Sequence, residues 1–148
     1  MSDLTQYGKE FPSGTLETAY KSLRGLEDLI PSIAAEAIPE IARLIEEQFA
    51  EGHDPYGKPW APLRPATLAK GRTPPPLTDT GYMRESVYVT ATSDGLRITV
   101  DGPSFFHQHG TDRMRARPIL PDKQARLPES WERAIDEAAS RAVAKVTR

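Results

Sequence analysis

Apolar residues return at intervals of three and four along the first third of the chain, the spacing of a helix with one buried face. One stripe predicts a helix over residues 16–30. Pro31 is expected to end it, because proline lacks the backbone donor that a helix interior needs. A second stripe predicts a helix from about 32 to 50, ended by Gly52. Pro39 lies inside this second stripe and is expected either to kink the helix or to restart it.

The period changes to two after residue 86. Apolar and polar residues alternate over 87–92 and again over 96–100, and Ser93-Asp94-Gly95 between them is typical of a turn. The pattern predicts a β-hairpin with one buried face. The side chains expected on that face are Val87, Val89, Ala91, Leu96, Ile98 and Val100.

Shorter signals surround the hairpin. Residues 65–71 are typical of one or two helical turns closed by glycine. Residues 104–110 are compatible with a short helix that Ser104 caps and Gly110 ends. Ile119 and Leu120 lie between prolines and are expected to supply a short edge strand.

A last helix is predicted to start at Pro128, since proline suits a first helical turn. Its buried stripe is expected to consist of Trp131, Ala134, Ile135, Ala138, Ala139, Ala142, Val143 and Val146. Acidic residues stand at its start and basic residues at its end, as the helix dipole favours.

The order of these elements predicts an α+β fold. Residues 15–148 are expected to form one domain, in which helices pack against a small antiparallel sheet built on the hairpin. The polar residues 1–14 are predicted to be a flexible lead. The chain length also suits one domain.

A long proline-rich segment interrupts the fold. Residues 53–81 hold seven of the fourteen prolines. Tyr56, Trp60 and Leu63 lie among them and favour burial. Residues 54–76 are therefore predicted to be a semi-rigid, extended arm, ordered by contact with its own sheet or with a neighbouring subunit.

Composition narrows the setting. The chain has no cysteine, so disulfides and thiol chemistry are excluded. We expect no transmembrane span and no signal peptide, because no long apolar run occurs and the first residues are polar. Residues 1–60 carry eleven acids and five bases, whereas residues 61–128 carry six acids and ten bases. Chance surface patterning explains this asymmetry, and so does charge complementarity between subunits.

Four strings occur in a specific order: DPYGKPWAPLRPATLAK from Asp54, PLTDTGYMRESV from Pro76, FFHQHG from Phe105 and ARPILP from Ala116. In this order and spacing the chain resembles the phage virion morphogenesis (tail-completion) family, which includes relatives of the Mu-like G protein. The resemblance covers residues 33–131.

The resemblance implies a structural protein of a tailed phage or prophage, acting in tail completion at the head–tail junction, or neck. It implies a virion location, with assembly in the host cytoplasm. A junction of this kind usually needs a closed ring, and six copies of the chain are the natural guess. Expected partners are the chain itself, other phage neck and tail proteins and, non-specifically, phage DNA. A tail terminator of the same virion region is the alternative within this class.

Enzymatic chemistry finds little support in the sequence. His107 and His109 could bind zinc, so a small metal-dependent hydrolase is an alternative from another class. Their i, i+2 spacing separates them on a helix, and no third ligand stands at a diagnostic distance. No nucleotide-binding or hydrolase motif occurs. We therefore expect no catalytic residues, no cofactor and no metal.

Arg113, Arg115 and Arg117 form the one concentrated basic patch, with Lys123 and Arg126 nearby. Four roles are open for this patch: a solvated loop, a contact with an acidic face of a neighbouring subunit, a contact with DNA phosphates, or a set of intrachain salt bridges. A nucleic-acid-binding accessory protein is a further alternative. The candidate interface residues are Tyr56, Trp60, Leu63, Arg113, Arg115 and Arg117.

Overall fold

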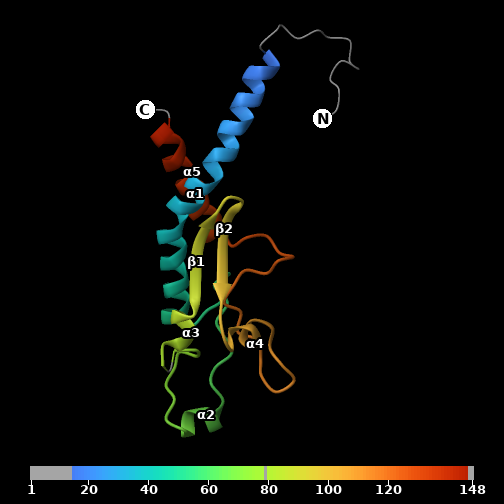
Figure 1. The fold of residues 1–148 in the computed structure, drawn as a ribbon. Helices are drawn as coiled ribbons and strands as arrows, with labels where there is room; N and C mark the ends of the chain where they lie inside the picture. Colours follow the sequence, from blue (N-terminus) through green and yellow to red (C-terminus); the bar gives the residue numbers. More distant parts are fainter. Residues whose placement is uncertain (1–14, 79, 147–148) are drawn as a thin grey trace.

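The computed structural model describes residues 15–78 and 80–146 (Figure 1). The elements are α1 (Thr15–Glu51), α2 (Pro65–Ala69), α3 (Tyr82–Glu85), β1 (Val87–Thr92), β2 (Gly95–Val100), α4 (Ser104–His109) and α5 (Glu129–Val146). The fold is α+β, as predicted, with long helices packed against a two-stranded antiparallel hairpin. The expected lead, residues 1–14, lies outside the described residues.

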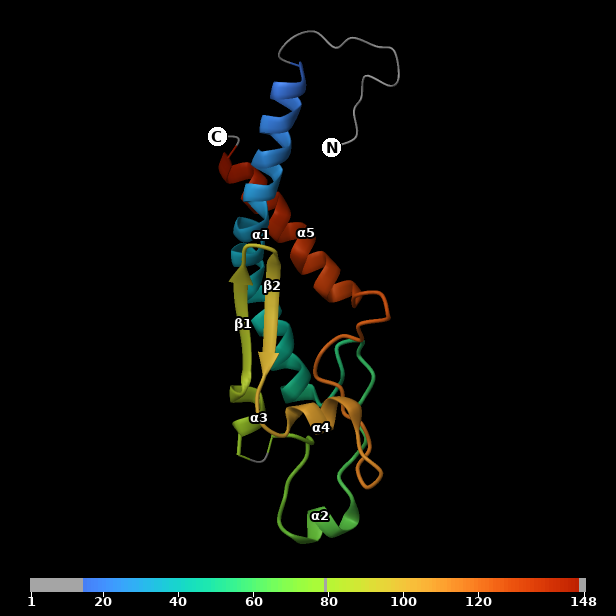
Figure 2. The same cartoon turned by 45° about the vertical axis from the view of Figure 1, so that its right-hand side comes forward.

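One continuous helix replaces the two predicted before residue 52. Pro31 and Pro39 both lie inside α1, so the expected stop at Pro31 is wrong. Each proline removes one backbone hydrogen bond at a cost of about 3 kcal/mol, but packing of an amphipathic face supplies most helix stability. The second half of α1 packs against α5 and both strands. The helix changes direction between its blue and teal parts (Figures 1 and 2), which is a usual effect of internal proline.

Gly52 ends α1, as predicted. Its φ of 74° lies in the left-handed region that favours glycine, and its amide donates to the Gln48 carbonyl at 2.8 Å. A Cβ atom at position 52 would stand 2.9 Å from Pro75 Cβ. The proline run thus packs directly on the end of α1, where a larger residue would force it away.

The hairpin has the predicted strands and turn. Val87 faces Val100 and Thr92 faces Gly95, with two residues in the connection. Val87, Val89, Leu96 and Ile98 pack against the core. Ala91 is exposed, contrary to the prediction, because it lies at the turn end of the hairpin, away from the core cluster.

Helix α5 packs along α1 through small side chains. Ala34 and Ala37 of α1 and Ala134, Ala138 and Ala142 of α5 are all buried. Alanine at the contact lets two helices approach closely. The buried stripe of α5 therefore follows these alanines and Trp131, and Ile135, expected on the stripe, is only half-buried.

The core lies where α1 meets α5 and the hairpin. The rings of Phe49 and Trp60 meet edge to face, with centroids 5.5 Å apart. Ile41, Ile45 and Ile119 complete the centre of the cluster. Among the described helices, none is both long and apolar enough to span a bilayer.

Helix α4 starts differently from the prediction. Ser104 does not cap it; its side chain is fully buried, and its hydroxyl lies 3.2 Å from the Ser86 hydroxyl. The Ser86 hydroxyl in turn donates to the Met83 carbonyl at 2.7 Å. A buried hydroxyl needs such a partner. Ser104 therefore connects the start of α4 to the end of α3 and does not act as a helix cap.

Candidate partner-binding site

Trp60 ties the start of the proline-rich segment to a segment far along the chain. Its side chain is 5% exposed, and its indole N–H donates to the Pro118 carbonyl at 2.8 Å. Its backbone N–H donates to the Gly52 carbonyl, also at 2.8 Å. A buried indole N–H usually finds a partner of this kind. We call the contacts that join residues 48–62 to residues 107–120 the clamp.

Asp54 shapes the turn before Trp60. One of its carboxylate oxygens accepts from the backbone amides of Tyr56 and Lys58, at 2.8 and 2.9 Å. Gly57 provides the positive φ that the turn requires. The Tyr56 hydroxyl donates to the Arg126 carbonyl at 2.9 Å, although 44% of the residue is exposed. The string DPYGKPW thus folds onto its own chain.

Two glutamines hold residues 119 and 120. Gln48 donates to the Ile119 carbonyl at 2.9 Å. Gln108 accepts from the amides of Ile119 and Leu120, at 2.7 and 2.8 Å, and donates to the Leu120 carbonyl. Side-chain amides therefore satisfy the backbone that the predicted edge strand would have paired, and residues 119–120 are not a strand.

Arg117 joins the clamp from the second segment. Its guanidinium donates to the carbonyls of Ala61 and Pro62, at 2.8 and 3.0 Å, and its backbone amide donates to the His107 carbonyl. Only 9% of the residue is exposed. Burial, and next the charge of Arg64, lower the pKa of Arg117. No carboxylate among the described residues pairs with it.

Two segments extend from the clamp at the same end of the molecule, as Figures 1 and 2 show. One is residues 61–78, with α2 at its tip, and the other is residues 111–116. Gly110 allows the second segment to fold back, since a Cβ there would lie 2.8 Å from the Ala116 nitrogen. Between the two segments lies a cleft of about 860 Å³.

The cleft is basic and partly apolar. Its cationic lining residues are Arg64, Lys70, Arg72, Arg113, Arg115 and Arg117. Leu63, Leu77 and Met114 contribute apolar surface. No aspartate or glutamate lines the described part of its wall. The arrangement suits an anionic ligand that also carries apolar groups.

His107 and His109 lie on different sides of α4. His109 is exposed, and its ring centroid is 4.8 Å from that of Phe105, itself 61% exposed. His107 is half-buried on the cleft wall, and its Nδ1 has no hydrogen-bond partner among the described residues. Burial, and to a lesser degree the charge of Arg117, lower the pKa of His107. The two imidazoles are not brought together.

The lowered pKa of His107 predicts a pH-dependent stability. Between the lowered value and the ordinary value near 6.5, the unfolded chain binds more protons at this residue than the folded chain does. Stability should therefore fall as the pH drops below about 6.5. Urea unfolding at pH 7.5 and 5.5 measures this change. His107→Gln should reduce this loss of stability between pH 7.5 and 5.5. His109→Gln, on the exposed side of α4, should leave the loss unchanged. An equal loss of stability in both variants would contradict the prediction.

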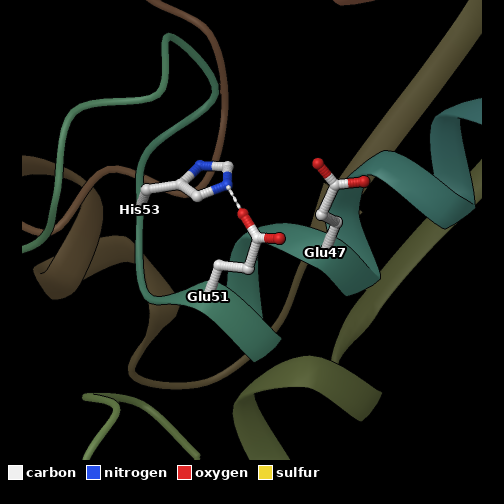
Figure 3. A group of neighbouring side chains, drawn as sticks. All are labelled: Glu47, Glu51 and His53. Carbon is white, nitrogen blue, oxygen red and sulfur yellow. Dashed lines mark hydrogen bonds and ion pairs between the residues drawn. The ribbon is translucent and has the colours of Figure 1, made fainter.

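A different group of side chains has the spacing of metal ligands. Glu47, Glu51 and His53 offer ligand atoms within 4.8 Å of one another at the end of α1 (Figure 3). His53 Nε2 lies 3.1 Å from Glu51, and its Nδ1 lies 2.7 Å from the Asp54 carbonyl. Glu47 pairs with Arg43 at 2.8 Å. These contacts account for all three side chains within the chain.

The six predicted interface residues divide into three groups. Trp60 and Arg117 are buried and serve the clamp, because their polar groups find carbonyl partners in their own chain. Tyr56 is half-exposed but bonded to its own chain. Leu63, Arg113 and Arg115 line the cleft.

Sequence reasoning missed several residues of the site. Gln48 and Gln108 hold the clamp, but a glutamine in a helical stripe gives no signal of a distant carbonyl partner. Arg64 and Lys70 face residues 111–116, the arginine loop, across the cleft, although some fifty residues separate them in sequence. The basic excess over residues 61–128 was the one available signal.

Comparisons of the chain with models of protein families, with curated proteins and with solved structures found no match.

Proposed function

We propose that the protein is a structural component of a tailed phage or prophage that acts in tail completion at the head–tail junction. It works by stoichiometric binding and not by catalysis. The supporting observation is the clamp: three of the four strings that carry the family resemblance meet there, as Trp60, Gln108 and Arg117. In the clamp these residues form hydrogen bonds with backbone groups of their own chain, so their role is structural.

The clamp presents two projecting segments, and we assign the contact with neighbours to them. The outer part of the arm of residues 54–76 carries α2, whose five residues include no buried side chain. Leu68 at its centre is 46% exposed. The inner part of the arm, around Trp60, packs on its own domain. The outer part is therefore the portion available to lie on a neighbouring subunit or on another neck or tail protein.

Self-association has its own supporting surface. The first half of α1 extends beyond the body of the fold (Figure 2). There Leu26 is 60% exposed and Ile30 is 39% exposed, four residues apart on one helical face. Val143 and Val146 at the end of α5 are exposed as well. An apolar face of this kind is expected to be covered in an assembly, and a closed ring of six copies is the arrangement we propose.

The acidic residues of α1 bear on how such a ring is held. Arg43 bridges Glu40 and Glu47, Arg84 pairs with Glu46, and Glu36 pairs with Arg141 and Lys145. Because these carboxylates have partners within the chain, complementarity of an acidic α1 with the arginine loop of a neighbour gains little support. Apolar contact along α1 is the better-supported interface.

The assembly role predicts the effect of charges placed on this apolar face. The double variant Leu26→Glu with Ile30→Glu should stop ring formation, since a buried unpaired carboxylate costs several kcal/mol at each interface. The unfolding temperature of the monomer should change little, because both side chains are exposed in it. Mass photometry and electron microscopy would measure the assembly, and infectivity of phage supplied with the variant would measure function.

Tyr88→Glu with Thr90→Glu is the matched control, since it places two charges on the exposed face of the hairpin. It should assemble normally if α1 forms the interface. Phage supplied with the α1 variant should accumulate separate heads and tails. Tails of abnormal length would instead favour the tail terminator, which stops tail growth. Normal infectivity with an unassembled variant would overturn the proposed role.

A further inference from the structure

The cleft between the arm and the arginine loop carries more positive charge than the acids of the described residues neutralise. Arg64 and Lys70 come from one wall, and Arg113 and Arg115 from the other. All four are exposed, and none forms an ion pair with an acid of the described residues. Cations gathered in a concave surface reinforce one another's field and raise the local concentration of anions.

The base of the cleft holds a buried positive charge that an anion would stabilise. Arg117 is buried there and bonds only to neutral carbonyls, while Arg64 lies close enough to disfavour its charge. A buried charge without a counterion is costly, and an incoming anion lowers that cost. His107 adds a buried nitrogen without a partner among the described residues. The four exposed cations and this base thus face one space.

The lining favours peptide over nucleic acid. Leu63, Leu77 and Met114 offer aliphatic surface suited to aliphatic side chains. Single-stranded nucleic acid binds through rows of aromatic residues on which bases stack. The described lining offers only the ring of Tyr82 and the half-buried imidazole of His107 for this purpose. A volume of about 860 Å³ holds a short segment and not a duplex.

The described residues of the chain offer no such segment. The acids of α1 are largely paired within the fold, as are Glu129 and Glu132 of α5. They also lie on helices, which cannot enter a cleft as extended chain. The described residues therefore contain no free acidic strand that a second copy could offer.

We propose that this cleft binds an extended acidic segment of a different protein. Carboxylates of the segment pair with Arg64, Lys70, Arg113 and Arg115, and an aliphatic side chain between them rests on Leu63 and Met114. The inference deepens the assembly role and rests on it for the source of the partner. The chemistry of the ligand follows from the cleft alone.

Fluorescence anisotropy on the purified full-length protein tests the site. The probe is a short fluorescein-labelled peptide in which glutamate and aspartate alternate with leucine and proline. The control peptide carries the corresponding amides in place of the acids. The acidic peptide should bind, more weakly as salt rises, and the amide peptide should not. Arg64→Gln with Arg115→Gln should weaken binding roughly tenfold, as two partly screened ion pairs are lost.

Arg97→Gln with Arg133→Gln removes the same charge from outside the cleft and should bind as the unaltered protein does. Equal weakening in both double variants would overturn the proposal, because it would show a response to net charge only. Absence of binding would overturn it too. Preferential binding of oligothymidylate, lost in the cleft variant, would assign the cleft to nucleic acid instead. If the protein binds the peptide but does not support head–tail joining, the proposal for the cleft stands and the proposed assembly role is wrong.

Discussion

Replacing Trp60 with alanine is expected to lower the free energy of unfolding by about 3–5 kcal/mol. The indole is 5% exposed and meets Phe49 edge to face. Its removal leaves a cavity and deprives the Pro118 carbonyl of its donor. Folded domains have only about 5–15 kcal/mol of stability, so the variant should lose a large share of its folded population.

Chemical denaturation of the monomer, followed by tryptophan fluorescence from Trp131 and by circular dichroism, measures this loss. Tyr56→Phe is a suitable comparison, because it removes only the hydroxyl that bonds to the Arg126 carbonyl and should cost about 1 kcal/mol. An unchanged midpoint for Trp60→Ala in a proven monomer would mean that the indole stabilises contacts between subunits instead of the domain itself.

Trp60 also determines the shape of the cleft, because the clamp has one face in the core and one on the cleft. Arg117 bonds to the carbonyls of Ala61 and Pro62, the first residues after Trp60, and lines the cleft. Loosening Trp60 should therefore release residues 61–78 as well. A clamp of this kind makes a binding surface rigid, and rigid surfaces lose less entropy on binding.

The periodic parts of the fold could be predicted from sequence. The alternation around residues 93–95 predicted the hairpin, and the glycine at 52 predicted the end of α1. Both signals are local, since they depend on the preferences of adjacent residues. The α+β class followed from the order of elements.

The continuity of α1 could not be predicted in this way. A rule that proline ends a helix is a statement about local cost, whereas α5 and the hairpin stabilise α1 along the second half of its length. The predicted stripe of α5 was right at Trp131 and at the three buried alanines, but it was too wide. It also included Ile135, which is half-buried, and Val143 and Val146, which are exposed. Isoleucine is more apolar than alanine, but a close helix contact selects the smaller side chain.

The clamp and the cleft were beyond sequence reasoning because their partners are distant along the chain. Gln48 reaches the carbonyl of Ile119, seventy-one residues away. Arg113 and Arg115 form a cluster that the sequence shows, but only folding places Arg64 and Lys70 opposite them. Spacing rules describe one element at a time, and this site is built from loops.

Ala138→Asp is expected to unfold the domain, because Ala138 is 0% exposed at the contact with α1. The larger side chain would separate the helices, and the buried carboxylate would have no cation beside it. Together these effects cost several kcal/mol, comparable to the whole stability of a domain.

Ile135→Asp, which the sequence pattern singles out, should be milder, since the half-buried side chain can turn its carboxylate to solvent. Ala144→Asp, on the exposed part of the same helix, is the control for helix propensity and dipole and should cost a few tenths of a kcal/mol. Thermal unfolding by circular dichroism ranks the three variants. Loss of stability at Ile135 equal to that at Ala138 would place the contact of α5 on a different face, with isoleucine and not alanine between the helices.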